Sequence, residues 1–109
     1  MVNFVGAGCG APDLITLRGA ELLRSADVII YAGSLVNPEL LKYAKEGCEI
    51  YNSAKMTLDE VIEVIEKSEK DGKNTVRLHT GDPSVYGAIR EQMDRLDALK
   101  INYAVCPGV

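Results

Sequence analysis

Basic residues are too few in this chain to form a nucleic-acid-binding surface. Twelve lysines and arginines stand against sixteen acidic residues among 109, which leaves a net charge of -4. Proteins that bind nucleic acid need clustered basic side chains to contact the phosphates. The composition therefore argues against DNA or RNA as a partner.

Long hydrophobic runs are also absent. No apolar segment approaches the ~20 residues that span a bilayer, and the amino terminus leads directly into a predicted strand without the pattern of a signal peptide. With 47% hydrophobic and 26% charged residues, the chain has the balance of a globular protein. We expect a single cytoplasmic domain that does not associate with membranes.

Cysteine and histidine are scarce and scattered. Cys9, Cys48 and Cys106 lie far apart, and His79 is the only histidine. A disulfide framework or a zinc site needs several such residues at short, regular spacings. We expect no metal, and we expect Cys48 and Cys106 to be small buried side chains in a reducing compartment.

The apolar pattern alternates between strand and helix along the whole chain. Strands are predicted at residues 2–7, 27–31, 48–51, 75–79 and 101–106. Helices are predicted at residues 16–25, 39–45, 58–71 and 84–99. This alternation is typical of an α/β domain with a mainly parallel five-stranded sheet and helices on both faces.

Two of these segments carry a more specific signal. The nearly continuous apolar run at residues 27–31 predicts a strand that is buried on both faces. Thr57 and Glu60 have the spacing of a capping box ahead of an apolar helical stripe formed by Val61, Ile62 and Ile65. A helix is therefore expected to begin directly after Thr57.

A loop between the fourth strand and the last helix has the features of a ligand site. Gly81-Asp82-Pro83 interrupts the strand pattern, and helical spacing resumes at Val85. Loops at the carboxyl ends of parallel strands form the ligand crevices of α/β sheets. Gly81 allows close approach of the backbone, and the free amides ahead of the helix can donate hydrogen bonds.

A second glycine-rich loop follows the first strand. Residues 6–11, Gly-Ala-Gly-Cys-Gly-Ala, formally match the dinucleotide-binding fingerprint. An NAD site also needs an acidic residue at the end of the second strand, where the sequence has Tyr31-Ala32-Gly33-Ser34. The alternative is that these glycines serve only a tight turn.

Single side chains leave similar alternatives open. Asp82 could bind a ligand or the amides of its own loop. His79 could be catalytic or structural. Tyr31, Tyr51 and Tyr86 lie near strand ends or loops, where each ring could line a pocket or pack in the core.

Three segments carry motifs that agree with one another: residues 6–19, residues 26–36 and residues 79–87. Together they resemble the tetrapyrrole (corrin/porphyrin) methyltransferases of cobalamin synthesis. Tyr-Ala-Gly-Ser-Leu-Val at 31–36 and His-Thr-Gly-Asp-Pro-Ser-Val-Tyr-Gly at 79–87 are most similar to the branch that methylates C11 of precorrin-4 or cobalt-precorrin-4. The resemblance extends over all 109 residues.

The resemblance implies a methyl transfer from S-adenosylmethionine to the corrin precursor, with release of S-adenosylhomocysteine. It implies a homodimer whose subunits have two α/β domains, with the cofactor between the domains and the macrocycle in a trough beside it. Residues 1–109 would be the amino-terminal domain, inactive without the second one. The alternatives are another tetrapyrrole methylase of the pathway, acting on precorrin-2 or precorrin-3, and a nucleotide-binding module without enzymatic activity.

Site residues also follow from the resemblance. Those on the cofactor side would be Cys9, His79, Thr80, Gly81, Asp82, Val85 and Tyr86. Those on the substrate side would be Tyr31, Gly33, Ser34, Lys55 and Met56. No catalytic acid or base is implied. The chain departs from the family at Cys9, where a proline is usual, and at Ala32, where relatives that act on uroporphyrinogen carry an acid.

Overall fold

The computed structural model describes residues 1–6, 17–31, 38–79 and 86–106. Its strands are β1 (Val2–Gly6), β2 (Val28–Tyr31), β3 (Glu49–Asn52), β4 (Thr75–His79) and β5 (Tyr103–Cys106). Its α-helices are α1 (Leu17–Ser25), α2 (Leu58–Lys70) and α3 (Tyr86–Ala98), and two short 3-10 helices are η3 (Pro38–Tyr43) and η4 (Ser53–Lys55).

The five strands form one sheet in the order β3-β2-β4-β1-β5. All four pairings between neighbouring strands are parallel. The predicted fold class is therefore confirmed. The expected burial of β2 is also confirmed, because Val28, Ile29 and Ile30 are fully buried.

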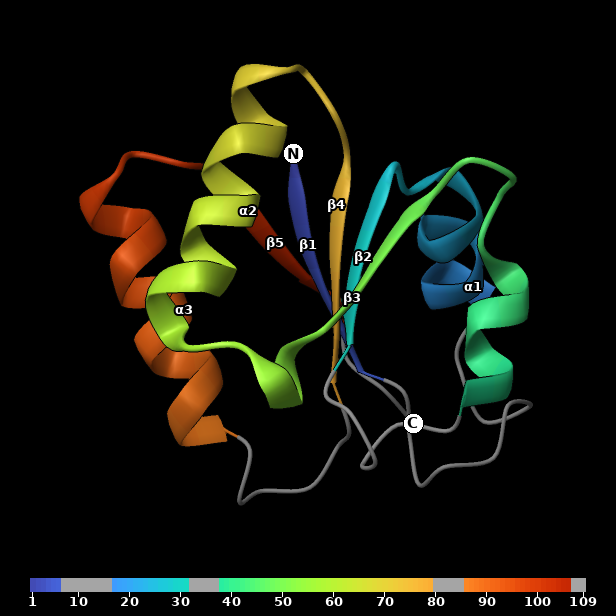
Figure 1. Ribbon diagram of the computed structural model, residues 1–109, viewed down its shortest axis with the longest axis horizontal. Coiled ribbons are helices and arrows are strands. Elements are labelled where there is room, and N and C mark those ends of the chain that lie inside the picture. The colour runs from blue at the N-terminus through green and yellow to red at the C-terminus, as the bar shows by residue number, and fades with distance from the viewer. Residues whose placement is uncertain (7–16, 32–37, 80–85, 107–109) are drawn as a thin grey trace.

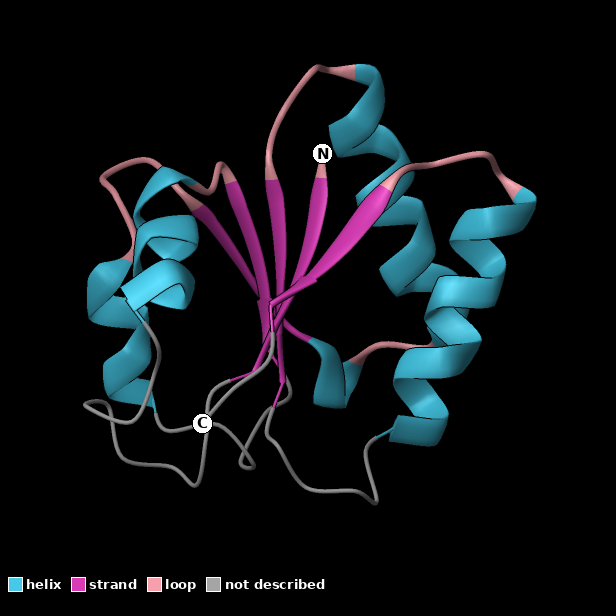
Figure 2. Cartoon of the chain, turned by 180° about the vertical axis from the view of Figure 1, so that it is seen from behind, coloured by secondary structure: helices cyan, strands magenta, loops and turns pink. Residues whose placement is uncertain are grey.

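Helices cover both faces of the sheet, as Figures 1 and 2 show from opposite sides. On one face, α2 and α3 enclose a core made of Val2, Phe4, Val28, Ile30, Val61, Ile62, Ile65 and Leu96. On the other face, α1 and η3 lie against a core made of Val5, Leu23, Ala26, Ile29, Val76 and Leu78. Alternate residues of β1 and β2 thus serve the two cores in turn, whereas Val76 and Leu78 of β4 belong to the second core.

The predicted capping box opens α2. The Thr57 hydroxyl accepts a hydrogen bond from the backbone N–H of Glu60 at 3.2 Å, and the Glu60 carboxylate accepts one from the backbone N–H of Thr57 at 3.1 Å. These bonds satisfy donors that have no partner inside the helix. Within the described part of the chain, no helix is long and apolar enough to pass through a membrane.

The predicted helix at residues 39–45 is wrong in type and in extent. The segment is the 3-10 helix η3, which begins at Pro38 and ends at Tyr43. The backbone N–H of Ala44 bonds to the carbonyl of Leu41, three residues earlier, at 3.1 Å. Short helices favour this tighter winding. Gly47 follows the segment, and its positive φ of 84° suits glycine.

Element ends differ from the predictions by one or two residues elsewhere. Strand β3 begins at Glu49, and β5 begins at Tyr103. The sequence interpretation missed η4, which follows β3 directly. Asn52 initiates η4 because its side chain accepts a hydrogen bond from the backbone N–H of Ala54 at 3.0 Å, a local turn that asparagine favours.

Candidate functional site

The carboxyl ends of the strands meet at one edge of the sheet. Gly6 at the end of β1 pairs with His79 at the end of β4. Tyr31 at the end of β2 pairs with Leu78 on one side and with Asn52 at the end of β3 on the other. The segments 7–16, 32–37 and 80–85, which contain predicted site residues, therefore follow strands that end at the same edge (Figure 1).

Strands β1 and β4 are neighbours whose connections lead to opposite faces of the sheet. The helix after β1 is α1, which lies with η3 on one face, and the helix after β4 is α3, which lies with α2 on the other face (Figure 2). In α/β sheets, connections that diverge in this way are typical of a ligand-binding crevice at the carboxyl edge. The two glycine-bearing loops thus begin at the same edge, as the sequence predicts.

His79 is the predicted cofactor-side residue that the structure describes best. It is the last residue of β4, it is 5% exposed, and it follows Leu78. Because Leu78 belongs to the core under α1 and η3, alternation along the strand places His79 on the α2 and α3 face. A buried polar side chain therefore lies at the strand end that flanks the crevice.

Tyr31 lies at the same edge but on the other face. Its half-buried side chain packs against the core that contains Leu78. The Ser53 hydroxyl donates a hydrogen bond to the Tyr31 carbonyl at 2.9 Å and so ties the end of β2 to η4. The structure therefore brings Tyr31 and His79 to one edge of the sheet without placing their side chains on one face.

Lys55 and Met56 lie farther along the edge, after β3. The Lys55 side chain is exposed, and Met56 is half-buried against the core under α2 and α3. Met56 also lines an open groove of about 510 Å³ between β3 and α2. The groove extends along β3 to Glu49 at its amino end. It is thus distinct from the edge of the sheet at which β1 and β4 end.

The other predicted site residues lie outside the described part of the chain. They are Cys9, Gly33, Ser34, Thr80, Gly81, Asp82 and Val85. Tyr86 is the first residue of α3, and its side chain is not among those described. The described residues contain no cluster of three or more histidine, cysteine or acidic side chains that could hold a metal ion.

The sequence interpretation missed a buried arginine just inside the carboxyl edge. Arg77 of β4 is 4% exposed, and its Nε donates a hydrogen bond at 3.0 Å to Oε1 of Gln92, which is also 4% exposed. Its Nη1 donates to the carbonyl oxygens of Leu78 at 3.1 Å and Ile30 at 3.3 Å. A charged residue inside the apolar strand pattern was the signal that could have identified it.

Burial also changes the proton affinity of this guanidinium. Removal from water disfavours the charged form and lowers the pKa of Arg77 to about 10. The side chain nevertheless remains protonated at neutral pH. The edge of the sheet beside the crevice therefore holds a fixed positive charge.

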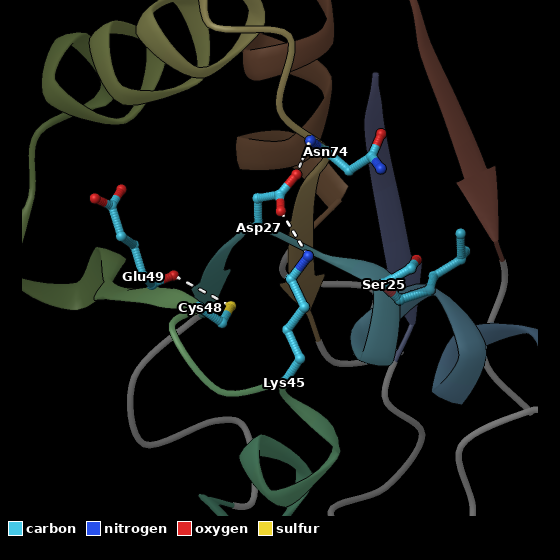
Figure 3. Close-up of polar contacts among 7 residues, drawn as sticks. Ser25, Asp27, Lys45, Cys48, Glu49 and Asn74 are labelled. Atoms are coloured by element: carbon cyan, nitrogen blue, oxygen red, sulfur yellow. Dashed lines mark hydrogen bonds and ion pairs between the residues drawn. The ribbon is translucent and has the colours of Figure 1, made fainter.

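The opposite, amino edge of the sheet is held by Asp27 (Figure 3). One carboxylate oxygen accepts a hydrogen bond from Lys45 Nζ at 2.6 Å, and the other accepts one from the backbone N–H of Asn74 at 2.9 Å. The hydrogen bond from Lys45 lowers the pKa of Asp27, with a smaller effect from Asn74. These contacts link the chain before β2, β3 and β4, and they lie far from the carboxyl edge.

Cys48 lies beside this cluster as a free thiol (Figure 3). It is half-buried against the core under α1 and η3, which agrees in part with the expected small buried side chain. Burial raises the pKa of the Cys48 thiol, so the thiol stays protonated at neutral pH. The side chains of Cys9 and Cys106 are outside the described set.

Comparison with known proteins identifies the family. The family model for Tetrapyrrole (Corrin/Porphyrin) Methylases matches residues 1–109. The chain belongs to the tetrapyrrole methylase family. The resemblance inferred from the glycine-rich segments is therefore confirmed.

Similar tetrapyrrole methylases have known names and structures. The chain is 57% identical over 108 residues to a cobalt-precorrin-4 C(11)-methyltransferase of Methanocaldococcus jannaschii, covering 99% of this chain and 42% of that protein. An X-ray structure of a cobalt precorrin-4 methyltransferase of cobalamin biosynthesis superimposes with a TM-score of 0.92 at 44% identity, over 99% of this chain and 45% of the other. This chain thus spans less than half the length of these tetrapyrrole methylases.

A third tetrapyrrole methylase was solved with a ligand. The uroporphyrin-III C-methyltransferase of Thermus thermophilus, complexed with S-adenosyl homocysteine, superimposes with a TM-score of 0.79 at 33% identity, over 99% of this chain and 44% of the other. The sheet of this chain is therefore shared by a protein that was solved with S-adenosyl homocysteine.

Proposed function

We propose that residues 1–109 are the amino-terminal domain of a methyltransferase that transfers the methyl group of S-adenosylmethionine to C11 of precorrin-4 or cobalt-precorrin-4. The observation that carries this proposal is the 57% identity to a C(11)-methyltransferase over 99% of the chain. The crevice between the ends of β1 and β4 fits the same conclusion, because α/β sheets bind nucleotide ligands at such an edge. The complete protein would serve cobalamin biosynthesis.

The second domain, the partners and the compartment are part of the same proposal. The relatives are more than twice as long as the stretch that they share with this chain, which supports a second domain on the far side of the crevice. The enzyme would act on a tetrapyrrole substrate as a cytoplasmic homodimer. We propose no nucleic-acid partner, in agreement with the net charge of -4.

The proposed residue roles divide into a cofactor side and a substrate side. Cys9, His79, Thr80, Gly81, Asp82, Val85 and Tyr86 would line the cofactor side. In this scheme the backbone of residues 81–85 holds the amino-acid part of the cofactor, and Asp82 shapes the loop. Tyr31, Gly33, Ser34, Lys55 and Met56 would line the substrate side. The positions of Tyr31 and His79 at the ends of β2 and β4 support this division.

Methyl transfer from a sulfonium does not need a strong acidic or basic side chain. S-adenosylmethionine supplies an electrophilic methyl group on a sulfonium, and a carbon of the electron-rich macrocycle attacks it in line. The protein contributes by aligning donor and acceptor and by excluding water. We therefore assign no catalytic acid or base.

The direct test is an assay of the complete protein with a methyl-labelled donor and the C17-methylated precursor. The expected result is one labelled methyl group at C11, identified by the mass and NMR spectra of the product. Methylation of uroporphyrinogen, precorrin-2 or precorrin-3 in preference to this substrate would assign the protein to another branch of the family. Binding of NAD in preference to S-adenosylhomocysteine, measured by thermal shift, would contradict the methyltransferase proposal as a whole.

A further inference from the structure

A buried arginine is difficult to explain by the stability of the fold alone. Arg77 lies in the core under α2 and α3, and within the described residues its hydrogen-bond acceptors are a neutral amide and two neutral carbonyls. Burying a charge is costly, and apolar residues of similar volume often give an equally stable or more stable core. A residue that breaks the local pattern in this way marks a functional position in many proteins.

The contacts of Arg77 join three elements near the carboxyl edge. Nη1 bonds to the carbonyl of Ile30 in β2 and to the carbonyl of Leu78 in β4. Each of these residues comes one position before the end of its strand. Nε bonds to Gln92, which belongs to α3. One planar guanidinium, whose donors have a fixed geometry, thus connects β2, β4 and α3.

These three elements flank the two segments on which the site depends. The segment 32–37 leaves the sheet from the end of β2, and the segment 80–85 connects the end of β4 to α3. Arg77 therefore fixes the two strand ends from which these segments leave, relative to each other and to α3. Errors of about 1 Å in placing reacting groups can cost about 100-fold in rate.

We propose that Arg77 is a positioning residue, which holds the ends of β2 and β4 against α3 and so sets the geometry of the crevice for the adenosyl cofactor. This inference rests on the proposed function. It assigns Arg77 no contact with the cofactor or the substrate. The residue acts through the backbone of Ile30 and Leu78 and through Gln92.

The test measures the dissociation constant of S-adenosylhomocysteine by calorimetry, and kcat and KM for the methyl donor, in the complete protein. Arg77→Met keeps an extended side chain without its donors, and we expect affinity to fall by about tenfold or more. Arg77→Lys keeps the charge but cannot reproduce the planar arrangement of donors, so we expect its affinity for S-adenosylhomocysteine to fall as well. Full affinity in Arg77→Met, within about twofold of the wild type, would overturn the proposal.

Two controls separate positioning from stability. Ile65→Val alters the same core from α2 and is expected to lower the melting temperature without changing affinity. At Gln92, the variant Gln92→Glu keeps an acceptor for Nε, whereas Gln92→Leu removes it. We expect Gln92→Glu to retain affinity within about threefold and Gln92→Leu to lose more.

The Gln92 pair also decides the case in which Arg77→Met does not fold. Equal affinities for Gln92→Glu and Gln92→Leu would then contradict a positioning role. The proposed function fails on a different result, which is a wild-type protein that does not bind S-adenosylhomocysteine. Wild-type binding with unchanged affinity in Arg77→Met would overturn only the role of Arg77.

Discussion

Gly6 and His79 pair across two parallel strands as the last residues of β1 and β4. The pairing joins the starting points of two loops that are distant in the sequence, and α1 and α3 then diverge to opposite faces of the sheet. A crevice at this position is where α/β sheets bind nucleotide ligands. The predictions below test what this edge does and what holds it in place.

The first prediction concerns Asp82 in the complete protein. We expect Asp82→Ala to weaken S-adenosylhomocysteine binding by about tenfold, because an aspartate in a turn can bond to the amides of its own loop and an alanine cannot. Calorimetric titration measures the effect. Asp71→Ala, an exposed aspartate at the end of α2, is the matched control. Unchanged affinity in Asp82→Ala would show that Asp82 does not shape the site.

The second prediction concerns residues 1–109 alone. We expect this chain to bind S-adenosylmethionine weakly, with a dissociation constant above about 100 μM, and to catalyse no methyl transfer. A ligand that is covered on only one side gains little binding energy. Circular dichroism should first establish that the isolated chain is folded. Calorimetry that gave micromolar binding for the folded chain would mean that the single domain completes the cofactor site.

The third prediction uses the pH dependence of stability. The pKa of Asp27 lies below its ordinary value of 3.8 because Lys45 and the Asn74 amide stabilise the carboxylate. Its contribution is therefore complete above the ordinary pKa and is lost as the pH falls through the lower value of the folded state. On acidification from neutral pH to about pH 3, the free energy of unfolding should therefore fall more in the wild type than in Asp27→Asn.

Denaturant unfolding at the two pH values gives this comparison. The exposed Asp94→Asn, whose carboxylate lies 3.5 Å from Arg90 on the surface of α3, is the control and should follow the wild type. If Asp27→Asn lost as much stability as the wild type on acidification, the carboxylate would not be the group that links the amino ends of β2 and β4.

The fourth prediction concerns the start of α2. Thr57→Ala removes the hydroxyl that accepts a hydrogen bond from Glu60, and we expect it to lower the free energy of unfolding by about 1 kcal/mol. Thr57→Ser retains the acceptor and should restore most of this loss. Equal stabilities of the alanine and serine variants in urea unfolding would mean that the capping box contributes nothing measurable.

Much of the local structure was readable from the residues. The sequence predicted the exact bounds of β4, the burial of β2 and the capping box at Thr57. Each of these features depends on residues that are close together in the sequence. The 3-10 winding of η3 was not readable, since its composition fits either helix type. The asparagine turn that begins η4 was missed because β3 continues into it without a break.

By itself, then, the sequence determined the alternation of strands and helices, the burial of β2 on both faces and the two glycine-rich loops that carry the family motifs. Only the tertiary structure decided that β1 lies beside β4, that Tyr31 and His79 face opposite sides of the sheet, and that Arg77 bonds to Ile30, Leu78 and Gln92. The physical reason is that periodicity records whether a residue is buried, whereas strand order and long-range hydrogen bonds depend on how the connecting helices pack.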